Sequence, residues 1–113
     1  MWELPGGSGK PGEDPTELAI RECKEETGLT LSRDRLTYHG TRQLAATMSC
    51  HRAHLFSAQL SDKELTGLYD RRGIPFGVAP NERTFVEIMI IREIRELELV
   101  DWTTLGMIYE VLG

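Results

Sequence analysis

The sequence has few cysteines, no long apolar run and fewer basic than acidic side chains. Cys23 and Cys50 are the only cysteines, too few for a disulfide framework, which fits a reducing cytoplasm, and we expect Cys23 to be a packed thiol. No stretch approaches the roughly 20 apolar residues of a transmembrane helix, and no signal peptide is visible. The formal charge of -5 argues against two classes of partner, long nucleic acid and an anionic membrane surface.

The length and composition are those of one small globular domain. A chain of 113 residues can form its own hydrophobic core, and we predict a single domain over residues 1–113. Hydrophobic residues make up 40% and charged residues 27%, which is ordinary for a soluble protein.

Helix-boundary signals bracket one segment near the start of the chain. Asp14 is a suitable N-cap, Pro15 suits the first helical position, and Glu17 completes an Asp-x-x-Glu capping pattern. Gly28 fits the left-handed position that ends a helix. The sequence therefore predicts a helix over residues 15–27.

Three glutamates on this predicted helix share one face. Glu22, Glu25 and Glu26 stand at positions i, i+3 and i+4, where like charges repel unless a cation lies among them. Clustered carboxylates are the ligands of a hard divalent cation such as Mg²⁺ or Mn²⁺. A solvated acidic face is the simpler interpretation of such a cluster, because charged residues are mostly exposed.

Other residues of the segment favour a built site over a solvated face. Arg21 can pair with Glu13 or orient a neighbouring glutamate, since its planar fork suits carboxylates. The glycines before the helix allow the backbone to approach a metal or a phosphate closely. They are Gly6, Gly7, Gly9 and Gly12.

The whole stretch, residues 7–29, reads GSGKPGEDPTELAIRECKEETGL and resembles the Nudix box, G-x5-E-x7-R-E-U-x-E-E-x-G-U, where U is aliphatic. Seven fixed positions match, a coincidence expected roughly once in 10⁸ to 10⁹ windows. Cys23 stands at a U position, where a small buried thiol is a fair substitute. The resemblance implies an α+β fold, an α/β/α sandwich with a mixed sheet between helices.

The resemblance also implies roles for the residues of the segment. Mg²⁺ or Mn²⁺ is expected on Glu22, Glu25, Glu26 and the backbone of Gly7. Arg21 belongs to the catalytic group as a support of the carboxylates. Glu13 and Gly28 are expected to support the site structurally.

The general base has three candidates. Glu82 lies on the loop before a late apolar run, the place of the base in the sugar-type members that the chain resembles. Glu87 lies inside that run and points either into the site or at solvent. Glu22 is the third candidate, because the same glutamate of the box serves as base in other members.

Two later segments are similar to the ADP-ribose and ADP-sugar pyrophosphatases. They are HLFSAQL at residues 54–60 and ELVDWTTL at residues 98–105. The resemblance implies a small-molecule nucleotide substrate, cleaved to AMP and a sugar phosphate. The alternatives are another substrate class, such as dinucleoside polyphosphates or nucleoside triphosphates, and an inactive fragment or nucleotide-binding module without turnover.

Aromatic and arginine side chains are the candidates for substrate binding. Phe76, Tyr69 or Trp2 could stack on adenine, and Arg42 or Arg52 could hold phosphate. The three histidines have no spacing typical of a metal site.

The remaining elements follow from local patterns. The family's first strands have no counterpart before Trp2, so we expect an N-terminally truncated domain, with first strands supplied from elsewhere or a reduced fold as the alternatives. The unpaired sheet edge favours a homodimer. We predict strands over residues 36–44, 53–60 and 84–91, a loop over 67–83, a short helix or turn over 92–98 and a helix over 102–112.

Overall fold

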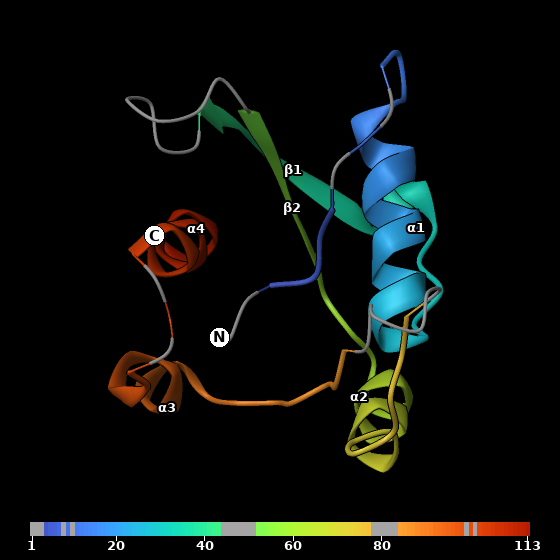
Figure 1. Cartoon of the computed structure of the whole chain (residues 1–113), viewed down its shortest axis with the longest axis vertical. Coiled ribbons are helices and arrows are strands. Elements are labelled where there is room, and N and C mark those ends of the chain that lie inside the picture. The colour runs from blue at the N-terminus through green and yellow to red at the C-terminus, as the bar shows by residue number, and fades with distance from the viewer. Residues whose placement is uncertain are drawn as a thin grey trace.

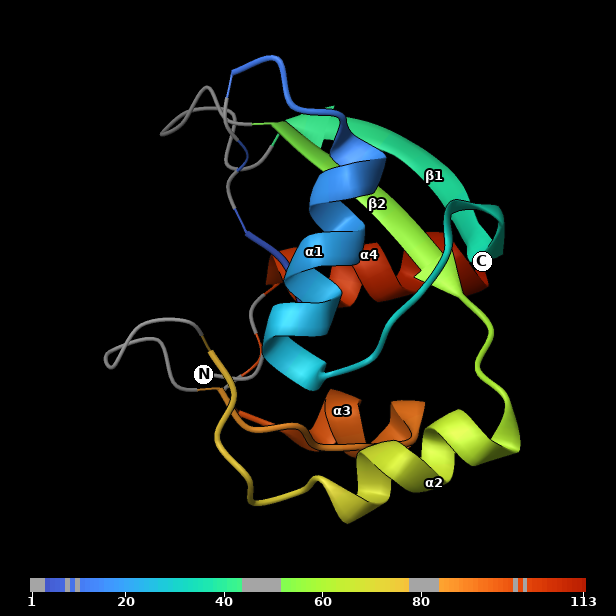
Figure 2. The same ribbon diagram turned by 90° about the vertical axis from the view of Figure 1, so that its right-hand side faces the viewer.

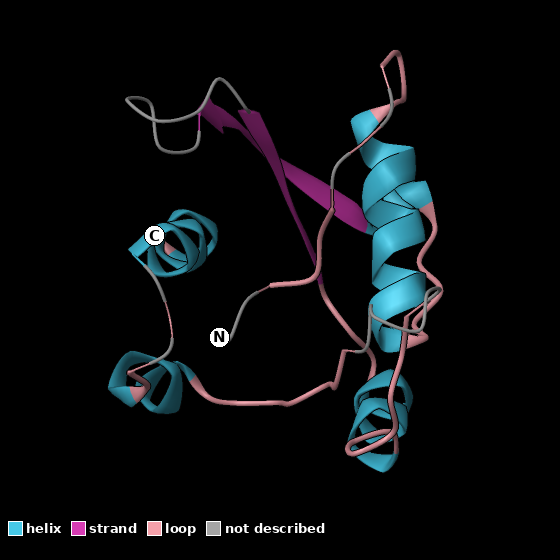
Figure 3. Cartoon of the chain, in the orientation of Figure 1, coloured by secondary structure: helices cyan, strands magenta, loops and turns pink. Residues whose placement is uncertain are grey.

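The computed structural model describes residues 4–7, 9, 11–43, 52–77, 84–98, 100 and 102–113. Its elements, in chain order, are α1 (Pro15–Thr27), a short 3₁₀ helix η1 (Arg33–Arg35), β1 (Leu36–Gln43), β2 (Arg52–Ala58), α2 (Asp62–Asp70), α3 (Ile91–Glu96) and α4 (Trp102–Leu112). Figure 3 shows that long loops separate several of these elements. Among the described residues, each helix is too short or too polar to cross a membrane.

The centre of the fold is the antiparallel pair β1 and β2. The register runs from Leu36 opposite Ala58 to Gln43 opposite Arg52, with an irregularity between Tyr38 and Gly40. Helix α1 lies on one side of this pair and α4 on the other (Figures 1 and 2). The α+β class is therefore confirmed, although the sheet of the described residues has two antiparallel strands where the resemblance implies a mixed sheet.

The described part of the chain has a small hydrophobic core. Leu29, Leu31 and Leu68 are buried, and they come from the segment after α1 and from α2. Partly buried apolar side chains surround them: Cys23, Leu36, Ala58, Leu60, Val86 and Ile88. Cys23 is a free, half-buried thiol packed on this core, as its position on the helix predicts.

Helix α1 has the predicted boundaries. The Asp14 carboxylate accepts a hydrogen bond from the Thr16 amide at 2.9 Å, and Gly28 ends the helix with φ +74°. Glu17 departs from the predicted capping pattern, because its carboxylate accepts from Arg33 Nη1 at 2.7 Å. Both ends of the helix are thus fixed by residues of its own segment.

Helix α2 corrects the prediction that residues 67–83 form one long loop. Ser61 caps the helix, and its hydroxyl accepts from the Glu64 amide while the Glu64 carboxylate accepts from the Ser61 amide. Gly67 and Leu68 lie inside α2, and Leu68 is buried. Helical packing of Leu68 outweighs the helix-breaking tendency of the glycine.

The apolar run at residues 84–91 is not a strand, so the prediction of a strand there was wrong. Thr84 alone forms a bridge, with Phe76, and the residues after it carry no strand pairing. Val86 and Ile88 contact the core, whereas Phe85 and Ile90 are 59% and 55% exposed. An apolar run requires a neighbouring strand to become part of a sheet, and the described residues offer none here.

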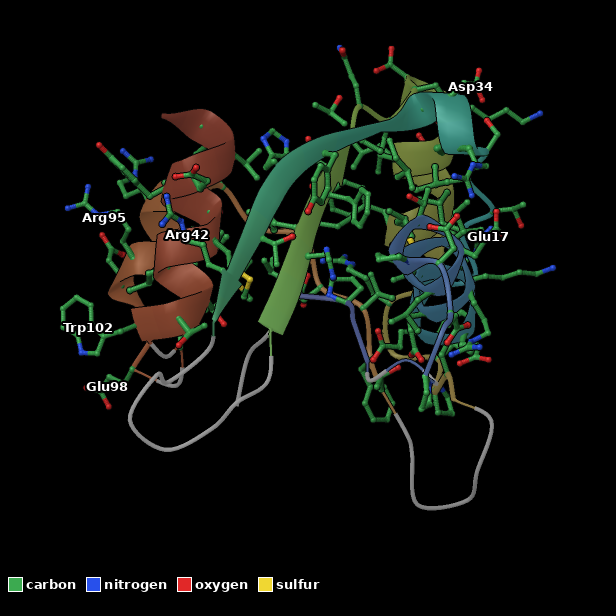
Figure 4. The ribbon with its side chains drawn as sticks, turned by 90° about the horizontal axis from the view of Figure 1, so that it is seen from above. Glu17, Asp34, Arg42, Arg95, Glu98 and Trp102 are labelled. Carbon is green, nitrogen blue, oxygen red and sulfur yellow. The ribbon has the colours of Figure 1, made fainter. Side chains whose placement is uncertain are left out.

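The C-terminal helices have nearly the predicted bounds, but α4 is more exposed than expected. The spacing of residues 105, 108, 109 and 112 places them on one face of this helix, a pattern typical of a core-facing stripe. Leu105 and Ile108 are half-buried, while Tyr109 is 74% and Leu112 64% exposed. In Figure 4, Trp102 and Arg95 point away from the strands.

Candidate functional site

One face of α1 and the loop before it form the candidate site. Glu22, Glu25 and Glu26 are half-buried on α1, and their spacing places them on the same side of the helix. Because Asp14 and Gly28 fix the two ends of α1, the register of these carboxylates is set by local sequence.

The loop residues Gly6 and Gly7 lie directly against two of these carboxylates. The Gly6 amide donates a hydrogen bond to Glu26 Oε2 at 2.7 Å. A Cβ built on Gly7 would lie 2.5 Å from both the carboxyl carbon and Oε1 of Glu22. Glu22 and Glu26 therefore converge on one exposed dipeptide, and only glycine leaves room for Glu22 there.

Arg21 contacts two carboxylates, those of Glu13 and Glu22. Its Nη1 donates to Glu13 Oε2 at 2.6 Å, and its Nη2 lies 3.7 Å from Glu22 Oε1. Glu13 in turn lies beside Gly9, where an added Cβ would be 3.2 Å from Glu13 Oε1. Arg21 thus makes both of the contacts that its position allows, pairing with Glu13 and lying beside Glu22.

The donor types of this face fit Mg²⁺ or Mn²⁺, which prefer carboxylate and carbonyl oxygens. Glu22, Glu25 and Glu26 supply carboxylates, and the space left by the missing Cβ of Gly7 receives one of them. Among the residues that the structure describes, no three Asp, Glu, His or Cys side chains are already grouped to hold a metal ion. Joint coordination by all three glutamates would therefore need side-chain rotation on a fixed helix face.

The candidates for the general base differ in their surroundings. Glu82 lies outside the described residues. The Ile88 amide donates to Glu87 Oε1 at 3.0 Å, and Arg72 Nη1 lies 3.3 Å from the same oxygen. These contacts, the amide first, lower the pKa of Glu87 below its usual value, whereas a general base works best with a pKa near the operating pH. Glu87 is therefore poorly suited, and Glu22 is the candidate that contacts the site loop.

Two of the aromatic candidates for adenine stacking, Tyr69 and Phe76, have partners of their own. The Arg72 guanidinium lies 5.0 Å from the centre of the Tyr69 ring. A Cβ added to Gly28 would lie 3.0 Å from the edge of the Phe76 ring, so this ring packs at the C-terminal end of α1. Trp2 lies outside the described residues.

Of the two arginine candidates for phosphate, Arg42 does not lie beside the carboxylates. Arg42 is exposed, and Figure 4 shows it on the α4 side of the strands, opposite Glu17 of α1. The backbone of Arg52 begins β2, and its side chain lies outside the described part of the chain.

Two residues outside every sequence motif, Arg71 and Thr84, reach the end of α1. Arg71 Nη1 donates to the Thr27 carbonyl at 3.2 Å, and Thr84 Oγ1 donates to the Glu26 carbonyl at 3.2 Å. Both come from far along the chain, at separations of 44 and 58 residues. No local motif identifies such contacts.

Comparisons with known proteins agree with these features. The model of one family, the NUDIX domain, matches residues 1–89. The mouse protein named Nucleoside diphosphate-linked moiety X motif 6 is 55% identical over 29 residues, covering 26% of this chain and 9% of that protein. An RNA pyrophosphohydrolase of Brucella ovis is 50% identical over 30 residues, covering 26% of this chain and 17% of that protein. The chain thus spans less than a fifth of these two relatives, and no solved structure matches it significantly.

Proposed function

The chain belongs to the NUDIX domain family, and from this premise we propose that it hydrolyses the diphosphate bond of a nucleoside diphosphate linked to a second group, X. The products are a nucleoside monophosphate and X-phosphate. The observation that carries the proposal is the convergence of Glu22 and Glu26 on the Gly6–Gly7 backbone. Hydrolase names among the relatives add support.

Glu22, Glu25, Glu26 and the backbone of Gly7 are the proposed ligands of Mg²⁺ or Mn²⁺. A divalent cation held there supplies positive charge for the diphosphate oxygens and lowers the pKa of bound water. The protein's own side chains keep these ligands in position. Arg21 keeps the half-buried Glu13 and Glu22 in place through its two contacts.

The reaction transfers a phosphoryl group to water. The water oxygen bonds to one phosphorus, the bond from that phosphorus to the bridging oxygen breaks, and a carboxylate takes the proton of the water. Glu22 is our first choice for this carboxylate among the described residues because it lies against the site loop. Glu82 is the alternative, from the resemblance of its position in the sequence.

The proposed X is ribose or another sugar, with adenosine as the nucleoside, so the products are AMP and a sugar phosphate. The support is the resemblance of residues 54–60 and 98–105 to ADP-sugar pyrophosphatases. Other substrates remain as alternatives: a dinucleoside polyphosphate, a nucleoside triphosphate or, from the name of the Brucella relative, an RNA 5′ end.

A substrate panel tests both the activity and X. Folded protein is incubated with ADP-ribose, several nucleotide sugars, dinucleoside polyphosphates, nucleoside triphosphates and 5′-triphosphorylated RNA, each with Mg²⁺ and with a chelator. We expect Mg²⁺-dependent AMP release to be fastest from ADP-ribose or an ADP-sugar. Faster cleavage of another class would overturn the choice of X but support the hydrolase. The absence of cleavage in the whole panel would contradict the hydrolase.

The second candidate function is nucleotide binding without turnover. The observation that favours it is the lack of three grouped ligand side chains in the part of the chain that the structure describes. Tight nucleotide binding that Glu26→Gln leaves unchanged, together with no product, would support this candidate over the hydrolase.

We also propose that the protein is a cytoplasmic homodimer. The support for the dimer is that both outer edges of the β1–β2 pair lack a third strand among the described residues, and unpaired edges favour association. Exposed Trp102, Tyr109 and Leu112 add apolar surface on α4. Light scattering that shows only monomers at high protein concentration would contradict the dimer.

A further inference from the structure

The last turn of α1 carries charges that oppose the helix dipole. Glu25 and Glu26 stand close to the C-terminus of the helix, which bears a partial negative charge, and Lys24 is the only basic residue of that turn. The last carbonyls of a helix also lack partners within it. An isolated helix with this sequence would therefore tend to fray where two of the proposed metal ligands lie.

Three hydrogen bonds offset this tendency. The Gly28 amide donates to the Lys24 carbonyl at 2.8 Å. Thr84 Oγ1 and Arg71 Nη1 donate to two further carbonyls of the last turn, those of Glu26 and Thr27, each at 3.2 Å. The Arg71 guanidinium also adds a positive charge where the helix dipole is negative.

Neighbouring residues fix the positions of the two side-chain donors, Arg71 and Thr84. Phe76 and Thr84 exchange two backbone hydrogen bonds of 2.8 and 2.7 Å, which set the position of the Thr84 hydroxyl. The Phe76 ring packs against Gly28, and Arg71 Nη1 lies close to the same glycine. Figures 1 and 2 show α2, which ends just before Arg71, below the C-terminal end of α1. The contacts therefore form one junction between the end of α1 and the segment after α2.

We infer that Arg71 and Thr84 are positioning residues, which hold the last turn of α1 so that Glu25 and Glu26 keep the geometry for metal binding. The inference rests on the proposed function, since it assigns these glutamates to the metal. It adds two residues that lie outside the motif at residues 7–29. Neither residue touches the substrate or the metal in this account.

Substitution of Thr84 tests the hydroxyl alone. Thr84→Val keeps the shape and removes the donor, whereas Thr84→Ser keeps the donor. Mn²⁺ affinity is measured on each folded protein without substrate, from the electron paramagnetic resonance signal of free Mn²⁺. We expect Thr84→Val to bind about tenfold more weakly, the lower end of the ~10–100-fold loss typical of supporting partners, and Thr84→Ser to bind within about twofold of the wild type.

Arg71 and its neighbour give a matched pair of charge variants. Arg71→Met removes the contact with Thr27, whereas Arg72→Met removes the same charge from a side chain that contacts Glu87 and Tyr69 instead. We expect Arg71→Met to weaken Mn²⁺ binding about tenfold and Arg72→Met to change it less than about twofold. Equal losses in both variants would overturn the inference, because they would trace the effect to net charge.

Hydrogen exchange separates a local effect from general unfolding. In the metal-free Thr84→Val protein, we expect faster exchange at the Gly28 amide, whose bond lies in the last turn. The Leu18 amide, which donates to the Asp14 carbonyl at 3.0 Å in the first turn, is expected to keep its protection. Faster exchange at both amides to the same degree would overturn the inference.

Mn²⁺ binding by the wild type distinguishes a failure of the inference from a failure of the proposed function. If the wild type binds Mn²⁺ and Thr84→Val binds it equally well, the inference is wrong and the proposed function stands. If the folded wild type binds no Mn²⁺, the metal site of the proposed function fails, and the inference falls with it.

Discussion

Substitution of Gly7 by alanine should displace the Glu22 carboxylate without unfolding the protein. A Cβ at residue 7 would lie 2.5 Å from Glu22 Oε1, whereas ordinary contacts begin near 3.4 Å, so the carboxylate must retreat by about 0.9 Å (3.4 − 2.5). The retreat is inexpensive for folding, since the end of a flexible side chain moves. Gly7 also has no positive φ, so alanine is not strained there.

Gly7→Ala should instead weaken metal binding and slow turnover. A misplacement of about 1 Å in a catalytic group can lower the rate about 100-fold, which corresponds to roughly 2.7 kcal/mol of transition-state stabilisation. The Gly7 carbonyl itself is unchanged by the substitution. We therefore expect kcat/KM for the best substrate of the panel to fall about 100-fold and the melting temperature to change little.

Gly6→Ala is the matched control for this experiment. It is the preceding residue, a Cβ there meets no atom within 4 Å, and alanine retains the amide that donates to Glu26. Steady-state kinetics at saturating Mg²⁺ and thermal melts are compared for both variants. Equal activity in Gly7→Ala and the wild type would refute the reasoning, as would an equal loss in Gly6→Ala and Gly7→Ala.

Three further predictions concern the proposed metal ligands, the end of α1 and the stability of the fold. Glu25→Gln and Glu26→Gln should each lower turnover by orders of magnitude with little loss of folding, and near-wild-type turnover would refute their assignment as ligands. Gly28→Ala should destabilise the protein by about 1–2 kcal/mol, because φ is +74° and Phe76 must move, whereas Gly28→Asn should cost less in a denaturant titration. Two hydrogen bonds of 2.6 Å from Arg35, followed by one from the Ser61 amide, lower the pKa of Glu64 to about 2. This depressed pKa stabilises the fold above the ordinary pKa of about 4.5, and the stabilisation is lost as pH falls from there towards 2. The difference in unfolding free energy between the wild type and Arg35→Met should therefore be constant above pH 4.5 and shrink below it; a constant difference down to pH 2 would contradict this.

Local signals made the first helix and its carboxylates predictable. Asp14 and Gly28 act on backbone groups within a few residues of themselves, so their sequence positions fix the ends of α1. The spacing of Glu22 and Glu26 then places both on one face, and their approach to Gly6 and Gly7 agrees with the motif.

The errors arose where packing between distant segments decides the structure. Gly67 suggested a loop, but the Ser61 cap and the burial of Leu68 make α2 a helix. The run after Thr84 resembled a buried strand, yet hydrophobicity alone does not provide the neighbouring strand that a sheet needs. Arg71 could not be chosen from sequence, because its contact with Thr27 spans 44 residues.

The most direct test of the central claim is phosphorus NMR of the best substrate during incubation with the folded wild type. The account predicts that the diphosphate signals give way to two phosphomonoester signals with Mg²⁺, that chelator stops the change, and that excess Mg²⁺ restores it. Equal cleavage with and without chelator would contradict the metal-dependent site on α1. An unchanged spectrum for every substrate of the panel would contradict the hydrolase itself.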